Sequence, residues 1–145
     1  MTDDMGPGRT LFQFVRFWAR RWTGTGAGID AERGRDVMVT QAALARADAG
    51  GATINDIAAE LGIDQSGASR MVAHAVAQGF LAKDVAVDAR QRIVSVTEAG
   101  RTLVSQAHTW QETTFARLTA DWSPADIARF TALMTRLVAS REDEL

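Results

Sequence analysis

Polar side chains suited to hydrogen bonding gather near the start of one stretch, GIDQSGASRMVAHAVAQGFL, which covers residues 62–81. If a helix begins after Asp64, these side chains occupy its first turns. An arginine can donate two hydrogen bonds to a guanine edge, glutamine can pair similarly with adenine, and a serine hydroxyl can reach a phosphate or a base. They therefore indicate recognition of a nucleic acid and not bond-breaking chemistry. The candidates are Gln65, Ser66, Ser69, Arg70 and His74.

Each of these candidates also has an ordinary structural explanation. Arg70 could be a solvated or ion-paired surface residue, and the two serines could be plain helix-surface residues. For His74 a packing or surface role is the more common one. The pattern as a whole favours recognition, because the helix N-terminus itself offers backbone N–H groups and partial positive charge to a phosphate.

The composition excludes most enzyme and metal chemistry. The chain of 145 residues has no cysteine and only two histidines, His74 and His108, which excludes disulfides, thiolate nucleophiles and cysteine–zinc sites. The glycine-rich run TGTGAG at 23–28 follows an expected helix, and no Walker lysine comes after it, so we interpret it as a linker. No nucleophile elbow is present. We therefore expect no enzymatic activity, no metal and no cofactor.

Length and hydropathy predict one folding unit, residues 1–145, located in the cytoplasm. The hydrophobic content of 46% is typical of a globular protein, and no apolar run approaches the roughly 18 residues that a membrane span needs. The first ten residues, MTDDMGPGRT, lack the basic-then-apolar pattern of a secretory signal. The formal net charge of −2 does not by itself indicate a nucleic-acid partner.

The elements that must position the candidate residues can be predicted from periodicity and capping signals. Apolar residues recur at helical spacing in 10–22, 31–47, 54–61, 65–78, 98–118 and from 124 onward. Helix starts are marked by Thr53 with Asp56, by Asp64, by Thr97 and by Ser123 before Pro124. Residues 81–96 read as a β-hairpin with a polar turn at 88–91. The two helices joined through Gly62 form a helix-turn-helix unit.

With this order of elements, the sequence resembles the MarR family of bacterial transcriptional regulators. The resemblance lies in TINDIAAELGIDQSGASRMVAHAVAQGFL at 53–81, in Lys83, and in DARQRIVSVTEAGR at 88–101. It implies a mainly α fold with a small β-hairpin wing, that is, a winged helix-turn-helix with N- and C-terminal dimerisation helices. The DNA-binding lobe would cover 31–96, and the dimerisation helices 9–23 and 98–140. Ala68 and Ala75 stand where the family usually has larger aliphatics, which suggests tighter packing or a softer lobe.

The hairpin supplies cations that the recognition helix lacks. Lys83 and Arg92 lie in its expected strands, where they can contact phosphates. By resemblance, Arg90 is the wing-tip arginine that enters the minor groove, and Asp88 is the carboxylate that orients it. A plain turn aspartate is the alternative explanation for Asp88. The wing is one residue shorter than usual between Gly79 and Asp88.

The apolar stripes predict a homodimer. The segments 10–22 and 98–140 hold all four tryptophans and more apolar surface than a lobe of this size can bury alone. A two-fold dimer would present two recognition helices to a pseudo-palindromic duplex. The resemblance also implies a small aromatic or amphipathic effector lodged between the dimer helices and the lobe. Trp18, Trp22 and Trp110 could line its pocket, although core packing is the more common role for each.

Two functions follow from the sequence. The first is a sequence-specific DNA-binding transcriptional regulator, a repressor that acts as a homodimer on double-stranded DNA and is released by an effector. The alternative is a winged-helix protein-interaction module that has lost DNA binding, which would be consistent with the overall acidity and the short wing. Substitution of Arg70 or Arg90 separates the two, because only the first needs them.

Overall fold

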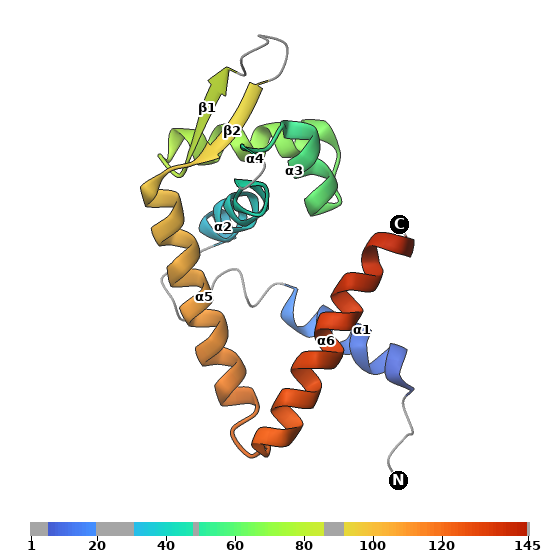
Figure 1. Cartoon of the computed structure of the whole chain (residues 1–145). Coiled ribbons are helices and arrows are strands. Elements are labelled where there is room, and N and C mark those ends of the chain that lie inside the picture. Colours follow the sequence, from blue (N-terminus) through green and yellow to red (C-terminus); the bar gives the residue numbers. More distant parts are fainter. Residues whose placement is uncertain (1–5, 20–30, 48–49, 86–91, 145) are drawn as a thin grey trace. The chain divides into compact units, whose positions relative to one another are not determined.

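The structure, a computed structural model, describes residues 6–19, 31–47, 50–85 and 92–144. Its described part is mainly helical with a two-stranded hairpin, as the sequence predicts (Figure 1). The order of elements is α1 (Pro7–Trp18), α2 (Ala31–Leu44), α3 (Ile54–Leu61), α4 (Gln65–Ala77), β1 (Leu81–Val85), β2 (Arg92–Val96), α5 (Glu98–Leu118) and α6 (Pro124–Glu144). The chain divides into two compact units, 1–108 and 109–145, and α5 runs from one into the other.

The core of the first unit holds the recognition elements together. Helices α2, α3 and α4 pack around fully buried side chains that include Val39, Ile57 and Val72. The hairpin closes this core with Leu81 and Val94, and a single β-bridge joins Val94 to Ala52. The first half of α5 adds a smaller cluster in which Leu103 and Ala107 pack against Val37 of α2 and the Phe80 ring.

The helix-turn-helix is set by local hydrogen bonds that the sequence predicts. The Thr53 hydroxyl accepts from the Asp56 amide at 3.1 Å, and the Asp56 carboxylate accepts from the Thr53 amide at 3.0 Å, which completes a capping box. Gly62 ends α3 in the left-handed conformation, with φ of +67°, where other residues are strained. The Asp64 carboxylate then accepts from the Gly67 amide at 3.0 Å and caps α4.

A second set of local bonds fastens the C-terminal end of α4 to α5. The Thr97 hydroxyl donates to the Gly79 carbonyl at 2.6 Å and accepts from the Gly100 amide at 3.1 Å. The Thr97 amide donates to the Phe80 carbonyl at 3.1 Å. A Cβ at Gly100 would overlap with that same carbonyl oxygen, so only glycine allows this close approach. The Thr-x-x-Gly pattern is thereby explained as a joint between the lobe and α5.

The second unit consists of the end of α5 and the whole of α6. Their aromatic rings pair: Phe115 stacks on Phe130 with centroids 6.2 Å apart, and Trp122 meets Phe130 edge-on at 5.2 Å. The Ser123 hydroxyl accepts from the Asp126 amide and caps α6, as predicted. In the described residues no helix is long and apolar enough to cross a bilayer.

Two helix boundaries differ from the sequence prediction. The first helix was expected at 10–22, but α1 begins at Pro7, whose fixed φ favours the first helical position. The second was expected to reach residue 47 and ends as an α-helix at Leu44, followed by a tighter turn. Such differences at helix ends are small and leave the helix-turn-helix unchanged.

Candidate nucleic-acid interface

Helix α4 presents a polar face to solvent and a small apolar face to the core. Gln65, Ser66 and Arg70 are exposed and Ser69 is half-buried. The core side of the same helix is formed by Ala68, Val72 and Ala75, each fully buried. Ala68 and Ala75 thus lie in the core, and whether they tighten the packing or soften the lobe stays a prediction. The structure therefore places four of the predicted contact residues together in the first two turns.

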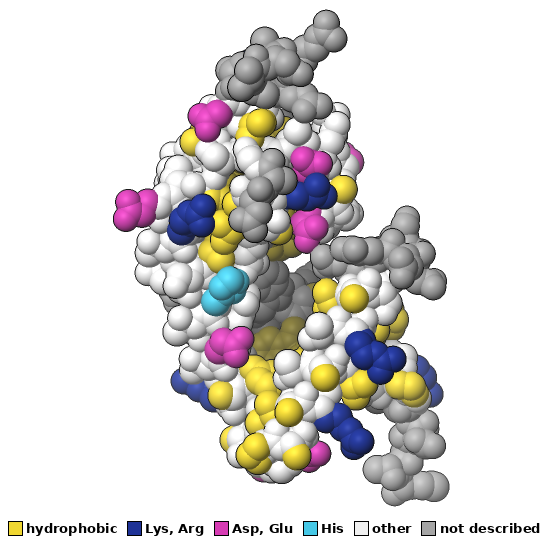
Figure 2. Space-filling model, in the orientation of Figure 1, with side chains coloured by type: hydrophobic (Ala, Val, Ile, Leu, Met, Phe, Trp, Pro, Cys, Tyr) yellow, Lys and Arg dark blue, Asp and Glu magenta, His cyan; other side chains and the backbone are white. Residues whose placement is uncertain are grey.

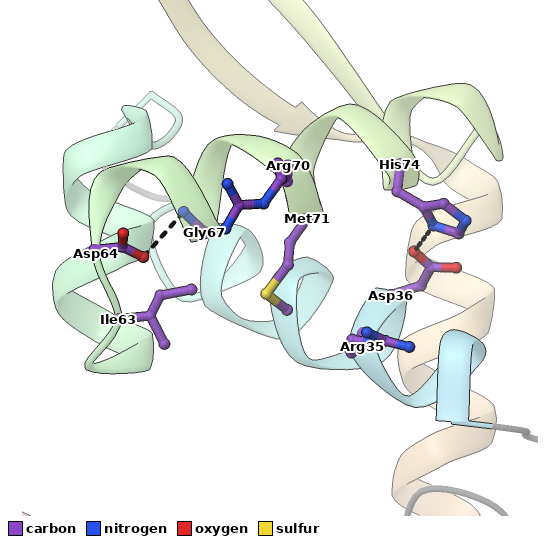
Figure 3. A pocket seen from close by; sticks show the side chains of 8 residues that line it. All are labelled: Arg35, Asp36, Ile63, Asp64, Gly67, Arg70, Met71 and His74. Atoms are coloured by element: carbon purple, nitrogen blue, oxygen red, sulfur yellow. Dashed lines mark hydrogen bonds and ion pairs between the residues drawn. The ribbon is translucent and has the colours of Figure 1, made fainter.

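His74 is held by a residue that is distant in sequence. Its Nδ1 lies 2.7 Å from Oδ1 of Asp36 on α2, and the Asp36 side chain is only 3% exposed (Figure 3). A buried carboxylate is costly unless it is paired, so this contact fixes α4 against α2. His74 is itself half-buried. Its geometry supports a structural role, and its predicted contact with DNA stays a prediction.

A hollow of about 590 Å³ lies beside α4, between this helix and α2. Figure 3 shows the side chains that surround it, with Arg70 on α4, Arg35 on α2 and Met71 between them in this view. The lining consists of Arg35, Asp36, Ile63, Asp64, Gly67, Arg70, Met71 and His74. The hollow thus adjoins the exposed polar face of α4, because Arg70 belongs to both.

The strands of the wing carry two of the predicted cations on one face. In the register of the hairpin Lys83 pairs with Val94 and Val85 pairs with Arg92, so Lys83 and Arg92 are diagonal neighbours on one side. Both are exposed. On the opposite face the Ser95 hydroxyl donates to the Asp84 carboxylate at 3.0 Å. Arg90 and Asp88 lie outside the described residues, and their roles at the wing tip stay predictions.

The charge of this lobe is nearly balanced. Residues 31–97 contain seven arginines and lysines and eight aspartates and glutamates, a formal sum of −1. On the face drawn in Figure 2, basic and acidic side chains are interspersed. Attraction to a polyanion must therefore come from the placement of a few cations and not from a general positive field.

The tryptophans proposed for an effector pocket are only partly described. Trp18 packs within α1 against Phe14 and Phe17, with centroids 6.1 and 5.4 Å apart. Trp110 is half-buried on α5. Trp22 lies outside the described residues, so the effector pocket stays a prediction.

Two residues of this region escaped sequence reasoning. Asp36 and Arg35 lie on α2, far along the chain from α4, and no motif marks them. An aspartate among apolar residues in DVMV was the one available signal, since buried acids are rarely without a partner.

Comparisons with known proteins agree with this architecture. The model of the MarR family matches residues 33–91, which include α3, α4 and β1. Wild-type MarR from E. coli in the apo form is 18% identical with a TM-score of 0.71, covering 93% of this chain and 98% of that one. S. aureus MepR in a complex with DNA is 16% identical with a TM-score of 0.66, covering 96% and 99%.

A third solved structure, the PcaV transcriptional regulator from Streptomyces coelicolor in complex with its natural ligand, is 18% identical with a TM-score of 0.65, covering 93% of each chain. The comparison with curated proteins gives no match. At such identities the structural likeness shows the fold, whereas the family model addresses the sequence of the lobe itself. Residues 33–91 thus match the model of the MarR family of transcriptional regulators, and the described residues have the fold of solved MarR-family proteins.

Proposed function

We propose that the protein is a repressor that binds a pseudo-palindromic operator as a homodimer. The observation that carries this proposal is the exposed N-terminal part of α4. Gln65, Ser66 and Arg70 are free to meet base edges because the capping bond of Asp64 and the pair between His74 and Asp36 hold the helix without using them. A helix-turn-helix places this end of its second helix in the major groove.

The wing would add binding affinity that does not depend on the DNA sequence. Lys83 and Arg92 share one face of the hairpin and can neutralise phosphates, while Arg70 and Gln65 discriminate between bases. The solved complex of MepR with DNA supports a DNA-binding role for this fold. Because the lobe is nearly neutral in charge, two copies on one duplex would be needed to reach useful affinity.

Exposed apolar side chains on α1, at the end of α5, in the turn after it and on α6 support the homodimer. Such surface is unusual on a monomer and marks a contact with a partner. Figure 2 shows part of it as yellow side chains over the end of α5 and α6. The side chains, between 39% and 68% exposed, are Leu11, Phe12, Phe14, Val15, Phe17, Leu118, Trp122, Phe130, Leu133, Leu137 and Val138.

An effector would act by changing the separation of the two recognition helices, which must lie about one duplex turn, roughly 34–36 Å, apart. The bound ligand in the PcaV structure supports a small-molecule effector, and aromatic or amphipathic compounds fit the tryptophans of this chain.

Selection of duplexes from random sequence by the purified protein, followed by sedimentation of the complex, tests the proposal. We expect enrichment of an inverted repeat bound by two protomers. Absence of any enriched sequence at low salt, together with intact folding, would favour the interaction module that has lost DNA binding. A monomeric mass at micromolar concentration would refute the dimer.

A further inference from the structure

Beyond the predicted contact residues, Arg35 on α2 lies at the edge of the DNA-reading surface. We propose that Arg35 contacts a backbone phosphate of bound DNA, so that the interface extends from α4 across the hollow onto α2. This inference rests on the proposed function and adds a residue that neither the helix-turn-helix pattern nor the wing pattern includes.

The hollow lies along one flank of α4. Gly67, Arg70, Met71 and His74 recur at intervals of three and four, so they form a stripe along one flank of the helix. The core side of α4 lies on Ala68. Arg70 is the exposed member of this stripe and also belongs to the polar face of α4 that would contact bases. The hollow is therefore continuous with the surface that would enter the groove.

The dimensions of the groove place a phosphate strand at such a flank. A helix with its side chains is about 10–12 Å wide, and the major groove of B-DNA is about 12 Å wide. When the exposed face of α4 meets base edges, its two flanks consequently face the sugar–phosphate strands that border the groove. Arg35 on α2 and Arg70 on α4 both line the hollow, with Met71 between them in the view of Figure 3.

Two guanidinium groups on the border of the hollow are available to an incoming anion. Arg35 and Arg70 are both exposed, and within the described part of the chain no ion pair engages either guanidinium. The two acids that line the hollow are committed elsewhere, since Asp64 caps α4 through the Gly67 amide and Asp36 is held by His74. A guanidinium pairs well with phosphate oxygens because its N–H groups form a rigid fork.

A phosphate of the duplex fits this place better than a small anion. Among the described residues that line the hollow, Ile63 and Met71 are the apolar ones, and the exposed Arg35, Asp64 and Arg70 border it. A small anion there would remain exposed to water. A duplex phosphate, in contrast, is held in place because the other contacts of the lobe bind the same duplex. Arg35 therefore needs to contribute only one contact.

The experiment measures the salt dependence of DNA binding by the full chain. Fluorescence anisotropy with the selected operator and with a scrambled duplex, over a series of KCl concentrations, compares the wild type with Arg35→Gln. Each phosphate contact contributes about 0.9 to the slope of log K against log salt. We expect Arg35→Gln to reduce the slope by about 0.9 per protomer on both duplexes, and Arg35→Lys to restore most of it.

Arg101→Gln is the matched control, because it removes an equal charge from an exposed position on α5. Its slope should equal that of the wild type. Thermal unfolding of each variant checks that the fold is kept. If the Arg35→Gln slope also equals that of the wild type, or if only the operator and not the scrambled duplex is affected, the phosphate contact is refuted.

A titration with inorganic phosphate at fixed ionic strength separates the remaining source of the anion. Saturable binding that Arg35→Gln removes, with an unchanged DNA slope, would assign the hollow to a small anion and overturn the proposal. If the wild type itself binds no duplex at low salt, the proposed function fails as a whole. These outcomes are distinct from a failure at Arg35 alone.

Discussion

The pair of His74 and Asp36 offers the sharpest test of how α4 is held. Substitution of His74 by alanine leaves the Asp36 carboxylate, 3% exposed, without the imidazole that lies 2.7 Å away. Breaking a buried pair costs about 3–5 kcal/mol when the remaining charge has no other partner. Because the His74 side chain is 36% exposed, water can replace part of the lost contact. We therefore expect His74→Ala to lower the free energy of unfolding by about 2–3 kcal/mol.

Urea denaturation of four proteins measures this effect: the wild type, His74→Ala, Asp36→Ala and the double variant. The double-variant cycle should give a coupling energy of about 1–2 kcal/mol, since removal of both groups leaves no stranded charge. His108→Ala, which removes an exposed histidine from α5, serves as the control and should change stability by less than about 0.5 kcal/mol.

Two results would refute this reasoning. The first is a coupling energy of zero within error. The second is a His74→Ala protein of normal stability that has lost its preference for the operator over a scrambled duplex. That second result would assign His74 to base recognition, as the sequence prediction included it, and would remove the structural role from the pair.

Three further predictions concern the packing and capping of the lobe. Thr40 is fully buried, and among the described residues its hydroxyl has no hydrogen-bond partner, so Thr40→Val should raise stability by about 1 kcal/mol in urea denaturation, whereas a lower stability would contradict it. Gly100→Ala should lower the unfolding free energy by roughly 1–3 kcal/mol because a Cβ there overlaps with a carbonyl oxygen. Gly8→Ala places a Cβ in open space and should not lower the unfolding free energy. Equal losses in the two variants would argue against the close contact of Gly100 with the Phe80 carbonyl. The pKa of Asp56 is held below its ordinary value of 3.8, chiefly by the hydrogen bond from the Thr53 amide. Its stabilising effect is therefore present above that value and is lost as the pH falls through the lowered pKa, so the stability difference between wild type and Asp56→Asn should shrink toward pH 3; a constant difference would be inconsistent.

Much of the lobe could be predicted from sequence because its signals are local. Thr53 with Asp56, Gly62 at the end of α3, and Asp64 before α4 each act within three or four residues of chain. Their hydrogen bonds form wherever the helix forms. The exposed face of α4 followed from the same spacing, since the apolar positions that must be buried leave the polar ones outside.

The remainder of the site depends on tertiary placement, which one sequence does not reveal. Asp36 meets His74 across 38 positions of the chain. Arg35 adjoins the reading face only because α2 crosses beside α4. The wing tip is a different case. The roles of Asp88 and Arg90 rest on family resemblance, because both residues lie outside the described part of the chain.

The central claim is that α4 chooses the operator sequence, and one binding measurement tests it most directly. Anisotropy titrations compare the wild type and Arg70→Ala on the selected operator and on a scrambled duplex at one salt concentration. We predict that Arg70→Ala lowers the ratio of the two affinities by roughly 5- to 150-fold per half-site, which corresponds to the loss of one bidentate contact with a base. An unchanged ratio in a folded Arg70→Ala protein would contradict the claim.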